Sequence, residues 1–412
     1  MAKYGLIGEK LSHSLSPMIH SMLGNDEYSL IEVEKDKIER FFKDRDFCAV
    51  NVTVPYKKIA YAACDILSET AQTLGNVNTV VKLDDGRLYG DNTDAYGFEY
   101  LLGRAGIDVN GKKCLVIGSG GASATVCAVL AGLEGDVSVL RHADNTEVGR
   151  APYLADTEIV VNTSPVGMYP HFDESPIRLS DFSSLYAAVD LIYNPRRTNF
   201  ILEATDLGIK YSGGLPMLVA QALRADEIFF GRKQSGDIVE SIIKKLDGAM
   251  CDIVLIGMPG CGKTTVGRVV AKKLGREFVD IDAEIERVTG MSIPDIFKAR
   301  GERGFREIES AVTVDICKSM GGRVIATGGG VVTVPENIPV IRRNSTVFFI
   351  ERPISTLPTS GRPLSAVGSL DEMYKKRAPL YKQACDLKVN GKSPEETADK
   401  ICEMFDCLPI NR

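Results

Sequence analysis

The stretch GMPGCGKTT, which begins at Gly257, constrains the fold more than any other part of the chain. It fits the pattern GxxxxGK[ST], follows the apolar run DIVLI and precedes the helix-forming run TVGRVVAKKL. Such a loop surrounds phosphate oxygens with backbone N–H groups, and the helix behind it adds the positive end of its dipole. The pattern therefore predicts a nucleotide-binding domain with a parallel sheet that starts near residue 250.

The chain is too long to fold around one core, because 412 residues indicate two or three domains. Hydrophobic residues make up 44% and charged residues 25%, which is typical of a globular protein in water. The net charge of −6 argues against nucleic-acid binding, which needs a basic surface. There is no secretory h-region and no apolar run of about 18 residues, so we expect a cytoplasmic protein without a membrane partner.

The ten cysteines lie in apolar stretches and form no CxxC pair. This distribution favours buried thiols over disulfides or a zinc site.

Short β-rich runs alternate with helical runs along the whole chain, which predicts an α/β fold with parallel sheets. The Asp-Gly pair in KLDDGRLYGD (82–91) predicts a hairpin, and DIVESIIKKLDGAM (237–250) predicts a helix closed by Gly248 before the second half begins. Further strands are expected at 3–8, 48–54, 113–120, 136–141, 158–164 and 187–193, and helices at 123–133, 198–207 and 217–230.

In the second half, Lys263 would bridge the outer phosphates of a nucleotide, and the Thr264 hydroxyl would bind Mg²⁺. Asp280 and Asp282 follow in FVDIDAEIE, and residues two apart share one side of a strand. One carboxylate could therefore serve Mg²⁺ and the other a substrate hydroxyl. Alternatively, Asp282 is a solvated acid or a helix N-cap.

Arginines and a glycine triplet follow in a fixed order: Arg306 in GERGFREIE, Gly328–Gly330 in ATGGGVV, Arg362 in SGRPLS and Arg377 in KKRAPLY. Arginine binds carboxylates and phosphates in bidentate fashion, and glycines let a small ligand approach the backbone. Taken with the phosphate loop, this order resembles the shikimate kinase family over 251–405. The segment RPISTLPTSG before Arg362 is shorter than the family usually has.

The resemblance implies that ATP phosphorylates shikimate with Mg²⁺, and that Asp282 holds the ring hydroxyls and acts as the base. Arg362, in the family's lid, would reach the transferring phosphate, and Asp280 would lie near Mg²⁺ with Thr264. Pro394 would border the adenine. The substrate carboxylate and ring would be held by Arg306, Gly328, Gly329, Gly330 and Arg377; the nucleotide would be held by Gly257, Gly260, Gly262, Lys263, Thr264 and Thr265.

In the first half, SHSLSP (12–17) places Ser14 and Ser16 on one side of an extended segment before a helix that Pro17 begins. Two hydroxyls that point the same way suit a carboxylate, and Ser16 is also expected to cap the helix. NVTVPYK presents Lys57 after a strand, where it could face Asp94 of GDNTD.

A second glycine loop, VIGSGGASAT, contains Gly118, Gly120 and Gly121 but lacks the last glycine of GxGxxG. The next strand ends in Arg141 and His142 rather than in an acid, which suits a 2′-phosphate and hence NADP. The alternative for Arg141 is a solvated strand end.

Seven motifs in order, SHSLSP, NVTVPYK, NVNTV, GDNTD, GSGGASAT, NTSPVGM and GGLPMLVAQ, resemble the shikimate dehydrogenase family over 4–246. The family implies a substrate-binding domain (1–97, completed by helices 218–246), a Rossmann-like NADP domain (98–217) and then the kinase domain (250–412). It also implies NADPH-dependent reduction of 3-dehydroshikimate.

By the same resemblance, Lys57 would donate the proton and Asp94 would orient it and hold a ring hydroxyl. Other substrate ligands would be Ser14, Ser16, Thr53, Asn78 and Gln221, with Tyr193 as a further candidate; cofactor ligands would be Gly118, Gly120, Gly121, Ala122 and Arg141. Only about twenty residues separate Arg141 from Asn162, too few for the usual strand–helix units of a Rossmann fold. LRHAD replaces the family's Asn-Arg-Thr motif there.

The two halves fit consecutive steps, because the product of the first is the acceptor of the second. We therefore expect a bifunctional enzyme whose partners are small molecules. Two alternatives stay open: a quinate/shikimate dehydrogenase fused to another small-molecule kinase, and a chain in which one half is a regulatory nucleotide-binding module.

Overall fold

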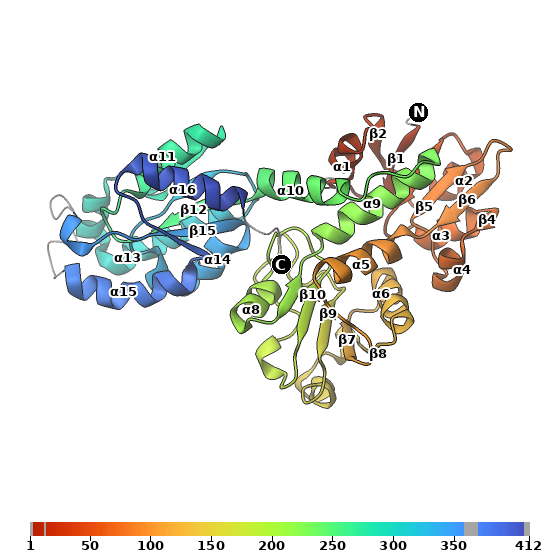
Figure 1. Cartoon of the computed structure of the whole chain (residues 1–412), viewed down its shortest axis with the longest axis horizontal. Coiled ribbons are helices and arrows are strands. Elements are labelled where there is room, and N and C mark those ends of the chain that lie inside the picture. Colours follow the sequence, from red (N-terminus) through yellow and green to blue (C-terminus); the bar gives the residue numbers. More distant parts are fainter. Residues whose placement is uncertain (1–2, 12–13, 358–369, 408–412) are drawn as a thin grey trace. The chain divides into compact units, whose positions relative to one another are not determined.

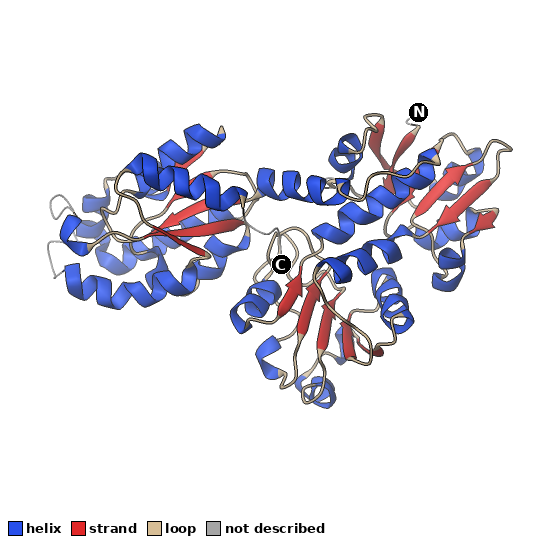
Figure 2. Ribbon diagram, viewed as in Figure 1, coloured by secondary structure: helices blue, strands red, loops and turns tan. Residues whose placement is uncertain are grey.

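The computed structural model of the protein describes residues 3–11, 14–357 and 370–407. They form two compact units. Unit 1 contains the residues up to Tyr193 together with Glu203–Lys245, and unit 2 contains Asn194–Leu202 and the residues from Leu246 onward. Figure 2 shows helices and strands alternating in both units, as the sequence predicts for an α/β fold.

Unit 1 begins with a six-stranded mixed sheet of order β2-β1-β3-β5-β6-β4. Strand β1 is parallel to β2 and β3, whereas β5 is antiparallel to β3 and β6. The predicted hairpin is thus confirmed as β5–β6. The strands are β1 (Tyr4–Gly8), β2 (Tyr28–Glu32), β3 (Ala49–Val52), β4 (Ile66–Leu67), β5 (Thr79–Lys82) and β6 (Leu88–Asp91), and the helices are α1 (Ser16–Met22), α2 (Ile38–Asp44), α3 (Lys57–Ala63) and α4 (Glu69–Leu74).

The second sheet of unit 1 has five strands, all parallel, in the order β11-β10-β9-β7-β8. Between β8 and β9 the chain makes only short helical turns, which is how it spans the few residues before Asn162. The elements are α5 (Thr93–Arg104), β7 (Lys113–Ile117), α6 (Gly121–Gly132), β8 (Asp136–Leu140), η1 (His142–Asp144), α7 (Glu147–Arg150), η2 (Ala151–Tyr153), β9 (Ile159–Asn162), η3 (Leu179–Asp181), β10 (Ala187–Asp190), α8 (Asn199–Leu207), β11 (Lys210–Ser212), α9 (Leu215–Phe230) and α10 (Ile238–Met250).

Helices α5 and α9 pack against each other beside the first sheet (Figure 1). Their approach depends on Gly97, because a Cβ atom there would lie 2.7 Å from the Met217 carbonyl oxygen. The close crossing brings residues from the start of α5 next to residues from the middle of α9, and both helices supply side chains to the site described below.

Unit 2 contains a five-stranded parallel sheet of order β13-β14-β12-β15-β16. Every residue of β12 and β15 is buried, as expected for central strands covered on both faces. Helices α11 and α16 cover one face, and α13, α14 and α15 the other (Figure 1). The elements are β12 (Asp252–Ile256), α11 (Lys263–Leu274), β13 (Phe278–Asp280), α12 (Ile281–Thr289), α13 (Ile293–Cys317), β14 (Val324–Ala326), η4 (Val331–Thr333), α14 (Asn337–Arg343), β15 (Ser345–Ile350), η5 (Ile354–Thr356), α15 (Leu370–Ala384), β16 (Leu387–Val389) and α16 (Pro394–Asp406).

Unit 2 also incorporates Asn194–Leu202, which precedes it in the sequence, so the start of α8 and the end of α10 belong to unit 2. The Arg197 guanidinium donates to both oxygens of Asp386, at 2.7 and 3.1 Å, and the Arg197 amide donates to the Arg343 carbonyl at 2.9 Å. Arg196 makes a second bidentate pair with Asp247, at 2.6 and 3.0 Å. This segment is therefore a structural part of unit 2.

Two local expectations were wrong. Ser16 does not cap α1: the N-cap is Leu15, without a side-chain hydrogen bond, and Ser16 is the first helical residue. Gly248 does not close α10, which continues to Met250. Glycine in a helix carries only a modest propensity penalty, which packing overrides.

All ten cysteines are free thiols, and only Cys407 is exposed. Within the described ranges, no helix is long and apolar enough to cross a membrane.

Two candidate active sites

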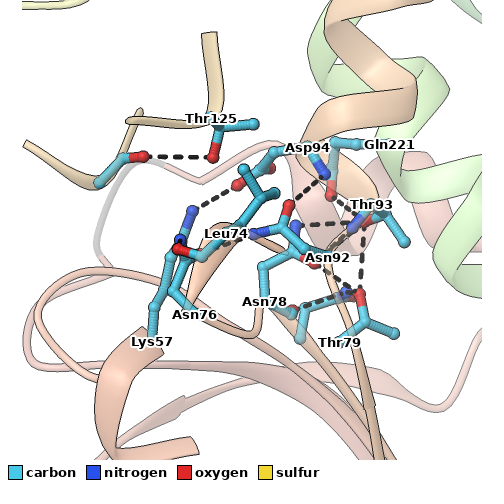
Figure 3. Close-up of polar contacts among 12 residues, drawn as sticks. Lys57, Leu74, Asn76, Asn78, Thr79, Asn92, Thr93, Asp94, Thr125 and Gln221 are labelled. Atoms are coloured by element: carbon cyan, nitrogen blue, oxygen red, sulfur yellow. Dashed lines mark hydrogen bonds and ion pairs between the residues drawn. The ribbon is translucent and has the colours of Figure 1, made fainter. Parts of the chain in front are cut away.

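The first site centres on an ion pair between Lys57 and Asp94. Lys57 is the first residue of α3, and Asp94 lies in the first turn of α5, whose N-cap Asn92 accepts from the Asp94 amide at 3.0 Å. The Lys57 Nζ atom lies 2.5 Å from Asp94 Oδ2, and the two side chains are only 18% and 15% exposed. Figure 3 shows the two side chains pointing toward each other from separate elements. Lys57 thus follows a strand, as the sequence predicts, and meets the predicted partner.

This pair opens into a cavity of about 230 Å³. The predicted substrate ligands meet there: Ser14, Ser16, Thr53, Asn78, Gln221 and Tyr193 all line it with Lys57 and Asp94. The Ser14 hydroxyl donates to Ser16 Oγ at 3.1 Å, so the two hydroxyls lie side by side as expected. The cavity combines a cation, a carboxylate, hydroxyls and amides, a set suited to a small polyhydroxylated acid.

The second glycine loop of the sequence lies between β7 and α6. Gly118 has φ +124°, and a Cβ atom there would lie 2.5 Å from Thr163 Oγ1, so the turn requires glycine. Side chains at Gly120 and Gly121 would meet nothing within 4 Å. Ser123 occupies the position of the missing last glycine, is buried, and donates to the Gly118 carbonyl at 2.9 Å. The loop therefore leaves the N-terminus of α6 open to an anion such as a pyrophosphate.

Arg141 directly follows β8 and is exposed. This is the position from which a side chain can reach the ribose 2′-position of a dinucleotide on such a loop.

The second site surrounds the phosphate loop of unit 2. Lys263, the first residue of α11, is buried, and its Nζ atom donates to the carbonyls of Gly257 and Met258 at 2.9 and 3.1 Å. These carbonyls hold the lysine amine across the loop, where it can meet phosphate oxygens. The loop follows β12, as the sequence predicts.

The predicted placement of Asp280 and Asp282 on one side of a strand was wrong. Strand β13 ends at Asp280, which caps α12 by accepting from the Asp282 and Ala283 amides, and Asp282 lies in the first helical turn. Because α12 begins between them, the two carboxylates lie in different surroundings. Asp280 Oδ2 accepts from Thr264 Oγ1 at 2.7 Å, and Asp282 lines the cavity next to the loop.

This second cavity has a volume of about 490 Å³. Burial raises the pKa of Asp282, and the nearby Lys263 charge opposes the shift only in part. The predicted residues that line the cavity are Gly260, Gly262, Lys263, Thr264, Thr265, Asp282, Arg306, Gly328, Gly329, Gly330 and Arg377; Gly257, Asp280 and Pro394 do not line it, and Arg362 lies outside the described residues.

The glycine triplet makes room for protein side chains. A Cβ atom on Gly330 would overlap the Arg306 guanidinium, and one on Gly328 would overlap Glu309 Oε1. Arg306 in turn forms a hydrogen-bonded ion pair with Glu309, which is fully buried. Among the residues that the structure describes, Glu309 Oε1 and Arg306 Nε have no hydrogen-bond partner. Burial raises the pKa of Glu309, opposed in part by Arg306.

Comparison with known proteins agrees with this geometry. Family models for the shikimate dehydrogenase substrate binding domain and for shikimate kinase match residues 6–80 and 259–406. Shikimate dehydrogenase (NADP(+)) of Clostridium beijerinckii is 39% identical over 249 residues, covering 56% of this chain and 92% of the relative. That of Clostridium perfringens is 35% identical over 268 residues, covering 60% and 98%. The chain belongs to the shikimate dehydrogenase family. With the shikimate kinase domain that follows, it is a bifunctional enzyme of the shikimate pathway.

Solved shikimate dehydrogenases share the fold of the first half. Shikimate dehydrogenase 1 from Peptoclostridium difficile has a TM-score of 0.53 at 32% identity, covering 60% of this chain and 98% of that one. The Thermus thermophilus enzyme, solved with NADP(H) and shikimate, has a TM-score of 0.52 at 32% identity, covering 58% and 98%. A chorismate mutase/shikimate 5-dehydrogenase fusion from Clostridium acetobutylicum has a TM-score of 0.53 at 34% identity, covering 59% and 96%.

Sequence reasoning missed three polar residues that line these shikimate-enzyme sites: Asn51, Glu309 and Thr327, which donates to the Leu255 carbonyl. Asn51 lines the dehydrogenase cavity, and Glu309 lines the kinase cavity. Asn51 stands in the motif NVTVPYK and was within reach of motif analysis. Glu309 follows Arg306 by three residues, a spacing that places both on one face of a helix, so helical periodicity could have found it.

Proposed function

We propose that the cavity around Lys57 reduces 3-dehydroshikimate to shikimate with NADPH, and that the cavity around Asp282 phosphorylates shikimate with ATP. The observation that carries the first assignment is the Lys57–Asp94 pair, held inside a cavity lined by the predicted substrate ligands. The relatives named for NADP(+), and the Thermus thermophilus enzyme solved with NADP(H) and shikimate, support the same substrate and cofactor.

In the dehydrogenase site, Lys57 donates a proton to the ketone oxygen as the carbonyl carbon is reduced. Asp94 holds Lys57 in position, and it accepts a hydrogen bond from a ring hydroxyl. Ser14 and Ser16 bind the substrate carboxylate, and the remaining polar groups bind hydroxyls: Thr53, Asn78 and Gln221.

NADPH, when bound, supplies the hydride. The residues present fit this cofactor, because the open N-terminus of α6 behind Gly118 can receive the pyrophosphate. Gly120, Gly121 and Ala122 lie along that turn. Exposed Arg141 is placed to contact a 2′-phosphate.

In the kinase site, Asp282 orients the acceptor hydroxyl and takes its proton, while Lys263 and the loop amides hold the phosphates. Arg306 and Arg377 bind the shikimate carboxylate. Arg377 reaches the glycine triplet, since it donates to the Gly329 carbonyl at 3.0 Å. The family resemblance assigns Arg362 to the transferring phosphate.

Thr264 and Asp280 fit a Mg²⁺ ion that neutralises phosphate charge. Their two oxygens lie 2.7 Å apart, and Mg²⁺ in such sites uses one or two protein oxygens, with waters and phosphates completing its shell.

The domain limits follow the same proposal: a substrate-binding domain (1–97, completed by helices 218–246), a Rossmann-like domain (98–217) and a kinase domain (250–412). The compact units support the limit before the kinase domain, except at 194–202, which packs with that domain. The two separate sheets of unit 1 support the division between the first two domains. We also propose a cytoplasmic location, since both reactions use soluble metabolites and cytoplasmic cofactors.

The deciding experiment incubates the purified full chain with 3-dehydroshikimate, NADPH and ATP·Mg²⁺. We expect NADPH consumption followed by shikimate 3-phosphate. Omitting ATP should stop the sequence at shikimate, and omitting NADPH should stop it at the start. If shikimate accumulates and is never phosphorylated when ATP is present, the kinase has another acceptor or only a regulatory role. Quinate and shikimate supplied in competition with NADP⁺ would identify a quinate/shikimate dehydrogenase.

A further inference from the structure

A chain of buried polar groups runs from the edge strand β2 to the dehydrogenase cavity. It begins at Tyr28, which is 5% exposed and does not line the cavity. The Tyr28 hydroxyl donates to Asn51 Oδ1 at 2.8 Å, and the Tyr28 ring stacks on His20 with ring centroids 3.8 Å apart. Asn51 lies in β3, between Tyr28 and the cavity that it lines.

Burial fixes the protonation of the first two groups. It raises the pKa of Tyr28 well above its usual value, and it lowers the pKa of His20 to about 3, although an interaction with Asn51 opposes the second shift. At neutral pH, therefore, Tyr28 carries its proton and His20 is uncharged. A tyrosine hydroxyl has one hydrogen, and here Asn51 Oδ1 receives it.

This donation sets the direction of the Asn51 hydrogen bonds, which lead on to Asn78. With Oδ1 of Asn51 facing Tyr28, its Nδ2 faces β5 and donates to the Asn78 carbonyl at 3.3 Å and to Thr79 Oγ1 at 3.1 Å. Thr79 Oγ1 accepts from Asn51, which leaves its own hydrogen for the next residue. It donates to Asn78 Oδ1 at 2.9 Å, a shorter contact than the 3.3 Å to Thr93 Oγ1. The Thr93 amide donates to the same oxygen at 2.8 Å.

The chain ends in a defined orientation of the Asn78 amide. Its oxygen accepts from the Thr79 hydroxyl and the Thr93 amide, and its Nδ2 donates to Thr93 Oγ1 at 3.1 Å. Figure 3 shows Asn78, Thr79 and Thr93 joined in this way, with Gln221 adjoining and the Lys57–Asp94 pair beyond. These contacts use one of the two Nδ2 hydrogens, and since Asn78 lines the cavity, the second can be donated to a bound hydroxyl.

All the linking residues are buried: Asn51, Asn78, Thr79 and Thr93 are each at most 5% exposed. A flipped amide in such a place would set two donors or two acceptors against each other, which a buried network tolerates poorly. The Tyr28 hydroxyl, which lies outside the cavity, therefore acts together with the Thr93 amide on the group that Asn78 presents inside the cavity.

We propose that Tyr28 is a positioning residue of the dehydrogenase, which orients the Asn78 amide toward substrate through Asn51 and Thr79. The inference rests on the proposed assignment of this cavity to shikimate. It predicts a role in substrate affinity rather than in proton transfer, because Lys57 and Asp94 do not take part in the hydrogen bonds that link Tyr28 to Asn78.

The test is Tyr28→Phe in the full-length protein, which keeps the ring on His20 and removes only the donor. We expect the KM for shikimate to rise roughly 3- to 10-fold, the range of one net hydrogen bond, while kcat, the KM for NADP⁺ and the kinase rate stay nearly constant. Tyr100→Phe is the matched control. It removes a hydroxyl on α5 that donates to Glu240 of α10 at 2.6 Å, outside the series of hydrogen bonds that starts at Tyr28. Equal KM values for the two variants would overturn the proposal.

A double-mutant cycle separates positioning from general loosening of the fold. Thr79→Val breaks the same chain one step later, so the KM of Tyr28→Phe with Thr79→Val should barely exceed that of either single variant. Multiplying effects, or a fall in kcat equal to the rise in KM, would show that Tyr28 acts only on the fold. Failure of the site assignment itself is distinguishable, because Lys57→Ala would then still reduce 3-dehydroshikimate.

Discussion

Lys57 Nζ and Asp94 Oδ2 lie 2.5 Å apart, although 37 residues separate them in the chain. One residue starts α3 and the other lies in the first turn of α5. Both side chains are largely withdrawn from water, so the ammonium is presented to the cavity in a fixed position. This relationship underlies the first prediction.

Lys57→Ala is expected to lower the reduction rate by ~10²–10⁴-fold, because it removes the general acid. The kinase rate of the same preparation should be almost unchanged and serves as the internal control. The measurement is NADPH oxidation with 3-dehydroshikimate, followed by ADP release with shikimate. A wild-type reduction rate in this variant would sink the assignment of Lys57.

Arg141→Ala should raise the KM for NADPH more than the KM for NADH, because an arginine at this strand end can pair with the 2′-phosphate. Steady-state kinetics with both cofactors gives the ratio. If the wild-type enzyme prefers NADH, our interpretation of Arg141 is wrong.

Asp282→Asn should cut the kinase kcat by on the order of 10²-fold or more, since it removes the base while keeping the shape. The affinity for ATP should barely change, because Lys263 and the loop amides bind the phosphates. Dehydrogenase activity should persist. Shikimate phosphorylation at the wild-type rate would place the base elsewhere.

The raised pKa of Asp282 adds a pH dependence of stability. A carboxyl whose folded pKa lies above its unfolded value binds more protons when folded, so its contribution to stability falls as pH rises through this range. The Asp282→Asn variant has no titrating carboxyl at this position, so it does not lose this stability as the pH rises. Its unfolding temperature should exceed that of the wild type at pH 8, and the difference should shrink as the pH falls toward about 4. A difference that does not vary with pH would contradict the raised pKa.

Gly330→Ala should impair shikimate binding, because the added Cβ would overlap the Arg306 guanidinium. Overpacking of this kind costs about 1–3 kcal/mol, so the KM for shikimate should rise roughly tenfold or more while ATP binding is retained. Gly248→Ala is the control, since its Cβ would meet nothing within 4 Å. If both variants bind shikimate equally well, the triplet does not serve to admit Arg306.

Arg197→Ala should destabilise unit 2 by about 1–3 kcal/mol, because it leaves the Asp386 carboxylate, whose side chain is 19% exposed, without its cation. Burial raises the pKa of Asp386, but the Arg197 charge and hydrogen bonds outweigh it and lower the pKa overall. This stabilisation is therefore present at neutral pH and is lost as the pH falls below about 4.

Lys273→Ala is the matched control, since it breaks an exposed pair with Asp399 and should change stability by about 0–1 kcal/mol. The stability of both variants is measured by urea unfolding, with the loss of kinase activity as the signal. Equal urea midpoints for Arg197→Ala and Lys273→Ala would show that residues 194–202 are not needed for the stability of unit 2.

The identity of the two activities could be predicted from short motifs. The phosphate loop and the Lys57 and Asp94 motifs each encode their chemistry within a few residues, and the order of the arginines adds a longer pattern. The hairpin at 82–91 and the helix after the second glycine loop were also predictable, because turn residues and periodicity act locally. Local patterns can mislead as well: Asp280 and Asp282 look like one side of a strand, but the strand ends at Asp280 and a helix begins.

What only the tertiary structure decided is which distant residues support those motifs. The sequence by itself indicated a close approach at the glycine triplet, but only the fold shows that the Arg306 guanidinium lies where a Cβ atom of residue 330 would be. It placed Tyr28 and Asn51 in separate strands, and only the parallel packing of β2 and β3 against β1 brings the hydroxyl to the amide. It placed Arg197 before the kinase domain, and only packing pairs it with Asp386. The physical reason is the same in each case: a buried polar or crowded contact is specified jointly by residues far apart, whereas a loop or helix start is specified by its neighbours.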